Sequence, residues 1–184
     1  MAANESHYSL PAPVFSADRT HLLVVISPYY KDIADNLLAG ARGAIKNAGA
    51  TCDVAEVPGA LEIPTAIRLA GNSSKYDGYV ALGCIIRGET THYDTVCNDS
   101  SRGLSLLGLQ GYCIGNGILT VENRDQAVVR AQSTGQNKGG GAAEAALHLI
   151  ALSRKFNKPT GGIGFKPASE HIIIADNSEG TKTA

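Results

Sequence analysis

The sequence predicts an α/β fold in which helices cover both faces of a parallel sheet. Two segments, "HLLVVI" and "YVALGCII", are continuous apolar runs of the kind buried inside a parallel sheet. Four strand segments in succession each lead into a segment with helical periodicity or capping signals. Because strand–helix–strand crossovers are right-handed, this order predicts a doubly wound three-layer sandwich.

The first half of the chain alternates strands and helices. Residues 21–26 form the first expected strand, and the helix after it ends at Gly49. That helix repeats apolar residues at steps of four: Ile33, Leu37, Ala41 and Ile45. Residues 51–57 alternate weakly as a second strand, Pro64 falls in the first turn of the next helix, and residues 79–86 form the third strand.

The second half continues the pattern. A helix through Leu107 leads to a strand over residues 112–121. Asn123 and Gln126 are three residues apart, which predicts a helix that starts with Asn123 as its cap. The last helix spans residues 140–156, and its small residues allow close packing. Its apolar stripe consists of Ala143, Ala146, Leu147, Ile150 and Ala151.

The chain of 184 residues fits one domain, expected at residues 21–157. Residues 1–20, with Pro11 and Pro13, are interpreted as an extended N-terminal arm. Residues 158–184 mix glycine, proline and charge, which favours a mostly flexible tail. Within that tail, "HIIIA" is the one segment suited to pairing or docking.

Composition disfavours several classes of partner. The formal net charge is -1 and lysines and arginines form no block, so a nucleic-acid partner is not expected. The longest apolar runs span about eight residues, whereas a membrane helix needs about 20. The N-terminus also lacks the basic and apolar regions of a signal peptide. We therefore expect a soluble, cytoplasmic protein with no membrane partner.

Cysteines and histidines show no metal-binding pattern. The cysteines occur singly in expected strands or helices, without a C-x-x-C pair, and are interpreted as small buried residues: Cys52, Cys84, Cys97 and Cys113. The histidines also lack ligand spacing: His7, His21, His92, His148 and His171. No metal and no cofactor are expected.

The stretch "RGETTHYD" stands where the third strand becomes a helix. Ligands of such sheets bind beyond the carboxyl ends of the strands. A helix N-terminus presents unpaired N–H groups, Gly88 permits close approach, and Thr90 and Thr91 add hydroxyl donors. These groups suit a phosphate, and His92 beside them can exchange a proton near neutral pH. The alternative is a plain threonine helix cap with an exposed histidine.

Other loop and helix residues have both a functional and a plain interpretation. Arg130 or Lys138 could neutralise a phosphate, with arginine the better clamp, or Arg130 could be a solvated helix charge. Glu62 could accept hydrogen bonds from a polyhydroxylated ligand or stabilise the helix start at Pro64. Tyr29 could stack on a planar ring or pack on the sheet edge.

Four motifs carry a family resemblance. In order, "VPGALEIPTAI", "ALGCIIRGETTHYDTVCNDSSRGL", "GNGILTVENRDQAVVRA" and "NKGGGAAEAAL" resemble the 6,7-dimethyl-8-ribityllumazine synthases over residues 21–156. The resemblance implies a flavodoxin-like three-layer α/β/α sandwich with a four-stranded parallel sheet. It also implies pentamers, or larger assemblies of them, with active sites shared between subunits. An association with riboflavin synthase is a further expectation.

The implied reaction belongs to riboflavin biosynthesis. It condenses 5-amino-6-(D-ribitylamino)uracil with 3,4-dihydroxy-2-butanone 4-phosphate to give the lumazine, phosphate and water, without cofactor or metal. By resemblance, Gly88, Glu89 and Thr90 cradle the phosphate and Arg130 of an adjacent subunit clamps it. His92 matches the proposed acid/base.

The resemblance assigns further residues to the uracil substrate. Those matching the loop around the ribityl chain are Gly59, Ala60, Leu61 and Glu62. The pyrimidine wall matches Ile85 and Ile86, with the neighbouring backbone at Cys84. Lys138 matches a position near the pyrimidine.

Two positions depart from the commoner family residues. Tyr29 stands where many members carry Phe or Trp to stack on the pyrimidine, and Asn116 stands where many carry Phe on the neighbouring subunit. Ligand affinity is therefore the property that the family resemblance predicts least well for this chain. A paralogue that binds flavin or lumazine with little catalysis is one alternative, and a scaffold or shell protein is another. Pentamer, decamer and capsid all stay open.

Overall fold

The computed structural model describes residues 10–15 and 20–157, and four parallel strands form its sheet in the order β2-β1-β3-β4. The strands are β1 (His21–Ile26), β2 (Thr51–Glu56), β3 (Gly78–Ile86) and β4 (Ile114–Val121). The helices are α1 (Lys31–Asn47), α2 (Glu62–Ala70), α3 (His92–Leu109), α4 (Arg124–Ala131) and α5 (Lys138–Asn157), with a short 3-10 helix η1 (Gly71–Ser73) after α2.

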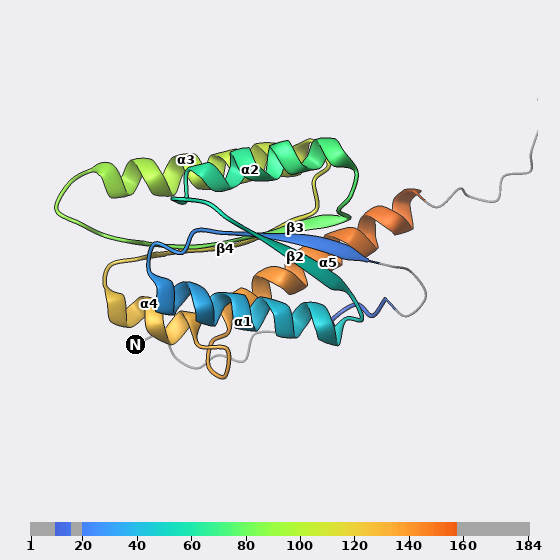
Figure 1. The fold of residues 1–184 in the computed structure, drawn as a ribbon, viewed down its shortest axis with the longest axis horizontal. Helices are drawn as coiled ribbons and strands as arrows, with labels where there is room; N and C mark the ends of the chain where they lie inside the picture. The colour runs from blue at the N-terminus through green and yellow to red at the C-terminus, as the bar shows by residue number, and fades with distance from the viewer. Residues whose placement is uncertain (1–9, 16–19, 158–184) are drawn as a thin grey trace, which may run out of the picture.

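The helices form two layers around the sheet. In Figure 1, α2 and α3 lie on one face of the sheet and α1, α4 and α5 lie on the other. Each face has its own apolar cluster: Leu22, Val24 and Leu37 belong to one, and Val25, Ile63 and Ile67 to the other. The predicted three-layer sandwich with a four-stranded parallel sheet is confirmed.

The connections leave a crevice between β1 and β3. These two strands pair directly, with Ile26 opposite Leu82. Yet β1 leads into α1 on one face, while β3 leads into α3 on the other. Chains that diverge in this way from neighbouring strands open a binding crevice at their carboxyl ends. This is the edge of the sheet where the expected site residues lie.

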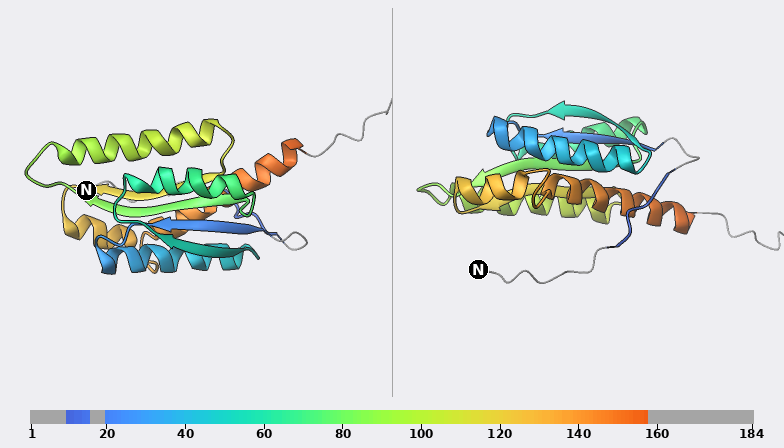
Figure 2. Two further views of the ribbon diagram at one scale, coloured as in Figure 1. Left: turned by 45° about the horizontal axis from the view of Figure 1, so that its top comes forward. Right: turned by 90° about the horizontal axis from the view of Figure 1, so that it is seen from below.

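Small residues bring α5 close to α1. A Cβ atom on Gly139 would lie 2.0 Å from the carbonyl oxygen of Leu37. Any larger residue at this position would therefore force the backbones of α1 and α5 apart. The stripe predicted for α5 is buried at Ala143, Ala146 and Leu147. Figure 2 shows α1 and α5 running along each other when seen from below. The helix begins at Lys138, two residues before the predicted start.

The predicted cap of α4 is confirmed. Asn123 has extended backbone geometry, and its Oδ1 accepts a hydrogen bond from the Gln126 amide at 3.0 Å. Gln126 Oε1 in turn accepts from the Glu122 amide at 3.0 Å. The reciprocal bond thus reaches one residue further back than in the usual capping box.

The cysteines are more exposed than predicted. Cys113 is buried, whereas Cys52, Cys84 and Cys97 are half-buried, and all four are free thiols. Within residues 10–15 and 20–157, no helix combines the length and apolarity needed to cross a membrane.

The predicted domain limits stay predictions. Of the expected arm, residues 10–15 and Thr20 are described, and the Phe15 amide donates to the carbonyl of Ala48 at 2.8 Å. The predicted tail, with its "HIIIA" segment, lies outside the described residues.

Candidate active site

A cavity of about 410 Å³ lies at the carboxyl ends of β1, β2 and β3. Its volume is within the usual range for small-molecule sites. Its walls come from the loops after these three strands and from the start of α3. The lining residues are Ser27, Tyr29, Tyr30, Gly59, Ala60, Leu61, Glu62, Cys84, Ile85, Ile86, Gly88, Thr90, His92, Tyr93 and Val96.

The loop after β1 contributes two tyrosines. Ser27 ties the loop to β3, because its amide donates to the carbonyl of Leu82 at 3.0 Å. Tyr29 is 76% exposed, so its ring is available to a ligand, and it meets Tyr30 edge-on at 5.1 Å between ring centroids. Burial raises the pKa of the Tyr30 phenol, which therefore stays protonated at neutral pH.

The loop after β2 forms a tight turn before α2. The Glu62 amide donates to the carbonyl of Gly59 at 3.3 Å. A Cβ atom on Gly59 would lie 2.8 Å from Glu62 Oε2, so glycine leaves room for the carboxylate to fold back over the turn. Glu62 thus lies on the cavity wall and also in the first turn of α2, where the helix dipole favours a negative charge.

The loop after β3 places the start of α3 at the cavity. Thr91 is the N-cap residue of this 18-residue helix, and its side chain makes no capping hydrogen bond. The His92 amide donates to Thr90 Oγ1 at 3.4 Å, which is long for such a bond. The plain threonine cap therefore accounts poorly for this stretch. The partial positive charge of the helix N-terminus stays available to an anion.

Protein packing does not require glycine at position 88. No described protein atom lies within 4 Å of the place that a Cβ atom on Gly88 would occupy, and its backbone is not in the left-handed region. Gly88 nevertheless lines the cavity. Close approach of a ligand to the backbone is a physical reason for glycine there.

The end of β3 forms an apolar part of the cavity lining. Ile85 is buried, and Cys84 and Ile86 are half-buried beside it. Burial raises the pKa of the Cys84 thiol to about 11. The thiol therefore stays neutral at physiological pH and acts as a small wall residue, not as a nucleophile.

Most of the predicted site residues meet in this cavity. Those that line it are Tyr29, Gly59, Ala60, Leu61, Glu62, Cys84, Ile85, Ile86, Gly88, Thr90 and His92.

Four predicted residues are not among those that line it: Glu89, Asn116, Arg130 and Lys138. Glu89 is exposed between Gly88 and Thr90. Asn116 is an exposed residue of the edge strand β4 whose Oδ1 accepts from the Ile118 amide at 3.0 Å. Arg130 lies on α4 and donates to the carbonyl of Gln126 at 3.0 Å, and Lys138 is the exposed first residue of α5.

The structure adds lining residues that were not predicted. They are Ser27, Tyr30, Tyr93 and Val96. Helical periodicity carries the signal for Val96, because residues four apart share one face of a helix and Val96 lies four residues after His92. Tyr30 lies in the first loop beyond a strand end, where ligands are expected.

Hydroxyl, carboxylate and imidazole groups line the cavity. Across the part of the chain that the structure describes, no three His, Cys, Asp or Glu side chains gather closely enough to hold a metal ion. The polar side chains that line the cavity are those of Ser27, Tyr29, Tyr30, Glu62, Thr90, His92 and Tyr93.

Comparison with known proteins gives one consistent family. The family model for 6,7-dimethyl-8-ribityllumazine synthase matches residues 19–154. A protein of that name from Jannaschia sp. is 54% identical over 176 residues, covering 96% of this chain and 98% of its own length. Those from Sphingopyxis alaskensis and Bartonella henselae are 51% and 53% identical and cover 74% and 76% of this chain, and 96% and 92% of their own lengths. The chain belongs to the 6,7-dimethyl-8-ribityllumazine synthase family.

Proposed function

We propose that the cavity at the carboxyl end of the sheet carries out the reaction of this family. The protein is a transferase of riboflavin biosynthesis. It condenses 5-amino-6-(D-ribitylamino)uracil with 3,4-dihydroxy-2-butanone 4-phosphate to form 6,7-dimethyl-8-ribityllumazine, phosphate and water. The observation that carries the assignment to this cavity is the start of α3, where the N-cap Thr91 makes no side-chain capping hydrogen bond and Gly88, Thr90 and His92 line the cavity.

The phosphate of the butanone substrate binds at the start of α3. Backbone amides of the Gly88–Glu89–Thr90 stretch and the Thr90 hydroxyl donate to it, and the helix dipole favours its charge. Holding the two reactants in one orientation supplies much of the rate, since well-oriented groups gain up to about 7–11 kcal/mol.

His92 transfers protons during the condensation. The uracil amine attacks the butanone carbonyl, and water leaves as the imine forms. His92 then accepts a proton from carbon as phosphate is eliminated, and the resulting enol becomes a carbonyl group. The ribityl-bearing nitrogen attacks this carbonyl, and loss of a second water closes the second ring. Its position on the wall that also bears Gly88 and Thr90 supports this role.

The uracil substrate occupies the remaining wall. The exposed Tyr29 ring stacks on the pyrimidine, which packs against Ile85 and Ile86. Glu62, folded back over Gly59, accepts hydrogen bonds from the ribityl hydroxyls.

A second copy of the chain completes the site. Arg130 does not line the cavity of its own chain. The family resemblance supports a role in which its guanidinium reaches the phosphate from a neighbouring protomer. Asn116 and Lys138, both exposed, approach the pyrimidine side in the same way. The assembly is a homopentamer or a larger assembly of pentamers. Its free thiols fit a cytoplasmic location, and association with riboflavin synthase belongs to the same proposal.

The first experiment measures turnover. The purified protein is mixed with both substrates, and the absorbance of the lumazine and the release of inorganic phosphate are followed. Both signals should rise together. A protein that binds the lumazine but forms none would instead be a ligand-binding paralogue.

The shared site is tested by co-expression of two impaired variants. In assemblies of His92→Ala with Arg130→Ala chains, some interfaces combine the intact His92 of one chain with the intact Arg130 of the other, so activity should partly return. The matched control combines His92→Ala with Gly88→Ala, which alter the same wall of one chain, so every site keeps one defect. Both mixtures are assayed at a butanone phosphate concentration below the KM of Gly88→Ala, and each is compared with its two variants alone. Equal activity in the two mixtures would contradict the shared site.

The phosphate cradle is tested with a pair of glycines. Gly88→Ala should raise KM for the butanone phosphate without changing the melting temperature, because its Cβ would meet no protein atom but would enter the space of the ligand. Gly108→Ala is the control, since its Cβ also meets no described atom and it lies far along α3. An unchanged KM in Gly88→Ala would refute the cradle.

A further inference from the structure

Arg87 is not a lining residue of the cavity, yet it joins three segments around it. It follows β3 directly, and its amide donates to the carbonyl of Val121 at 3.0 Å. Its Nε donates to Glu122 Oε2 at 2.7 Å, beyond the end of β4. Its Nη1 donates to Asp94 Oδ1 at 3.4 Å, in the first turn of α3. Its guanidinium carbon lies 4.1 Å from the centre of the Tyr93 ring.

These contacts act on the residues that the reaction needs. Tyr93 lines the cavity and follows His92 in the chain. Because the N-cap of α3 makes no side-chain hydrogen bond, capping does not fix the first turn of that helix. The planar guanidinium supplies a substitute: its Nε and Nη1 each bind one carboxylate, and its face stacks on an aromatic ring.

We propose that Arg87 is a positioning residue that fixes the first turn of α3, and with it His92 and Tyr93, relative to the ends of β3 and β4. This inference rests on the proposed function, because the reaction is what requires that geometry. Arg87 itself touches neither substrate.

Two other roles for Arg87 fit the contacts less well. A phosphate ligand would need a free guanidinium edge, but Nε and Nη1 already face Glu122 and Asp94. A purely stabilising role is weak, because the side chains of Arg87, Asp94 and Glu122 are 41%, 53% and 58% exposed and ion pairs at such exposure contribute little to folding.

The experiment compares four single variants and one double variant by steady-state kinetics and thermal unfolding. Arg87→Gln should lower kcat about tenfold to a hundredfold, since small misplacements of catalytic groups have effects of this size. KM for both substrates and the melting temperature should change little. Arg87→Lys keeps the charge but loses the planar fork and should recover only part of kcat. Arg102→Gln is the control, because Arg102 lies on α3 in an exposed ion pair with Asp99 and should keep full kcat.

The fourth single variant, Tyr93→Leu, removes the stacking partner. If Arg87 acts through the Tyr93 ring, the Arg87→Gln/Tyr93→Leu double variant should be no slower than the slower single variant. Full kcat in Arg87→Gln, full rescue by lysine, additive losses in the double variant, or an equal loss in Arg102→Gln would each overturn the positioning role.

A further variant tests the proposal if Arg87→Gln folds poorly. Glu122→Gln leaves Arg87 in place but weakens its tether, and should lower kcat about threefold with faster amide hydrogen exchange in residues 92–96. Unchanged kcat would overturn the proposal. A wild-type protein without turnover would refute the proposed function itself, whereas a loss of the Arg87 effect in an active enzyme refutes only this inference.

Discussion

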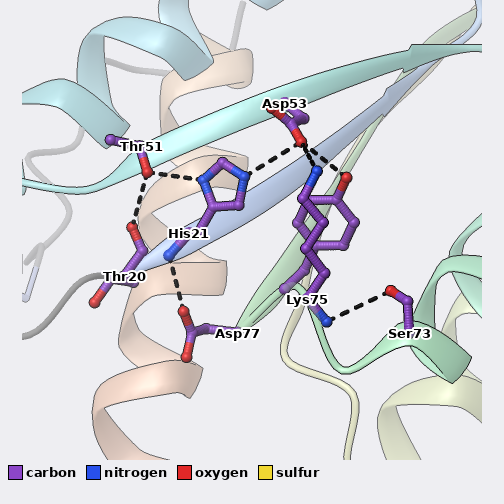
Figure 3. A network of polar contacts seen from close by, with 8 residues as sticks. Thr20, His21, Thr51, Asp53, Ser73, Lys75 and Asp77 are labelled. Atoms are coloured by element: carbon purple, nitrogen blue, oxygen red, sulfur yellow. Dashed lines mark hydrogen bonds and ion pairs between the residues drawn. The ribbon is translucent and has the colours of Figure 1, made fainter.

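The two ends of the parallel sheet use polar side chains in opposite ways. At the carboxyl end, the cavity presents Tyr29, Thr90 and His92 to the outside, and the side chain of the N-cap Thr91 makes no capping hydrogen bond. At the amino end, polar groups bind one another. Asp53 Oδ2 accepts from Lys75 Nζ at 2.6 Å and from Tyr76 at 2.9 Å (Figure 3).

The network at the amino end joins strands that are distant in sequence. His21 contacts Thr51 Oγ1 through Nδ1 at 2.7 Å, and its Nε2 lies 3.3 Å from Asp53 Oδ2 (Figure 3). The His21 amide donates to Asp77 Oδ2 at 2.8 Å. These bonds link the starts of β1 and β2 to the segment before β3. At the amino end these polar groups thus bind one another across the sheet. At the carboxyl end, the residue that makes such ion pairs, Arg87, is not a lining residue of the cavity, whereas Tyr29 and His92 line it.

The two ends also differ in the pKa shifts of their titratable side chains. Hydrogen bonds from Lys75, Tyr76 and His21 lower the pKa of Asp53 to about 2, so the network favours a charged carboxylate. At the cavity, burial raises the pKa of Cys84 to about 11 and keeps that thiol neutral. The network stabilises a fixed charge, whereas burial at the cavity wall keeps the Cys84 thiol neutral.

Replacing the histidine at the cavity should have the largest effect. His92→Ala should lower kcat about 10²- to 10⁴-fold, the range for a positioned acid/base, with an unchanged melting temperature because His92 is exposed. His21→Ala, at the other end, should lower the melting temperature and leave kcat of the folded enzyme unchanged. Steady-state kinetics and thermal unfolding of both variants check this. A folded His92→Ala enzyme with normal turnover would refute the proton-transfer role.

The sequence predicted the elements well because their signals are local. The steps of four in α1, the Asn123 cap and the apolar runs of β1 and β3 each depend on a few neighbouring residues. The carboxyl-end cavity followed from strand order, since loops at the ends of parallel strands must meet.

Contacts between distant segments could not be read from the sequence. Arg87 meets Glu122 across 35 residues and Lys75 meets Asp53 across 22, and which side chains meet depends on strand register and helix orientation.

Glycines at the two ends should differ sharply in their effect on stability. A Cβ atom on Gly115, near the start of β4, would lie 1.8 Å from the backbone carbonyl oxygen of Ala142. Gly115→Ala should therefore lower the free energy of unfolding by about 3 kcal/mol, as overpacking does. Denaturant unfolding measures this, with the cavity variant Gly88→Ala as the matched case that leaves stability unchanged. Equal free energies of unfolding for Gly115→Ala and Gly88→Ala would show that α5 can move away from β4 without loss of stability.

Removing the proposed clamp should change binding more than turnover. Arg130→Ala should raise KM for the butanone phosphate about tenfold to a hundredfold, because a hydrogen bond to a charged group contributes about 1.5–3 kcal/mol. KM for the uracil substrate should stay the same, which separates loss of the clamp from general damage. Arg102→Ala is the control, because Arg102 is another helix arginine, on α3. A rise of both KM values together would argue against a phosphate-specific role.

The smallest effect concerns acid stability and belongs to the amino end alone. The pKa of Asp53 in the folded protein, about 2, lies below the value of about 3.9 for an unfolded aspartate. Its contribution is therefore fully present above about pH 4 and is lost as the pH falls through about 2. Asp53→Asn lacks this titration, so the difference in melting temperature between it and the wild type should shrink as the pH is lowered from 5 to 2. A difference that stays constant over that range would mean that the carboxylate charge contributes nothing to the network, and that shape and hydrogen bonding alone hold the strands at that end.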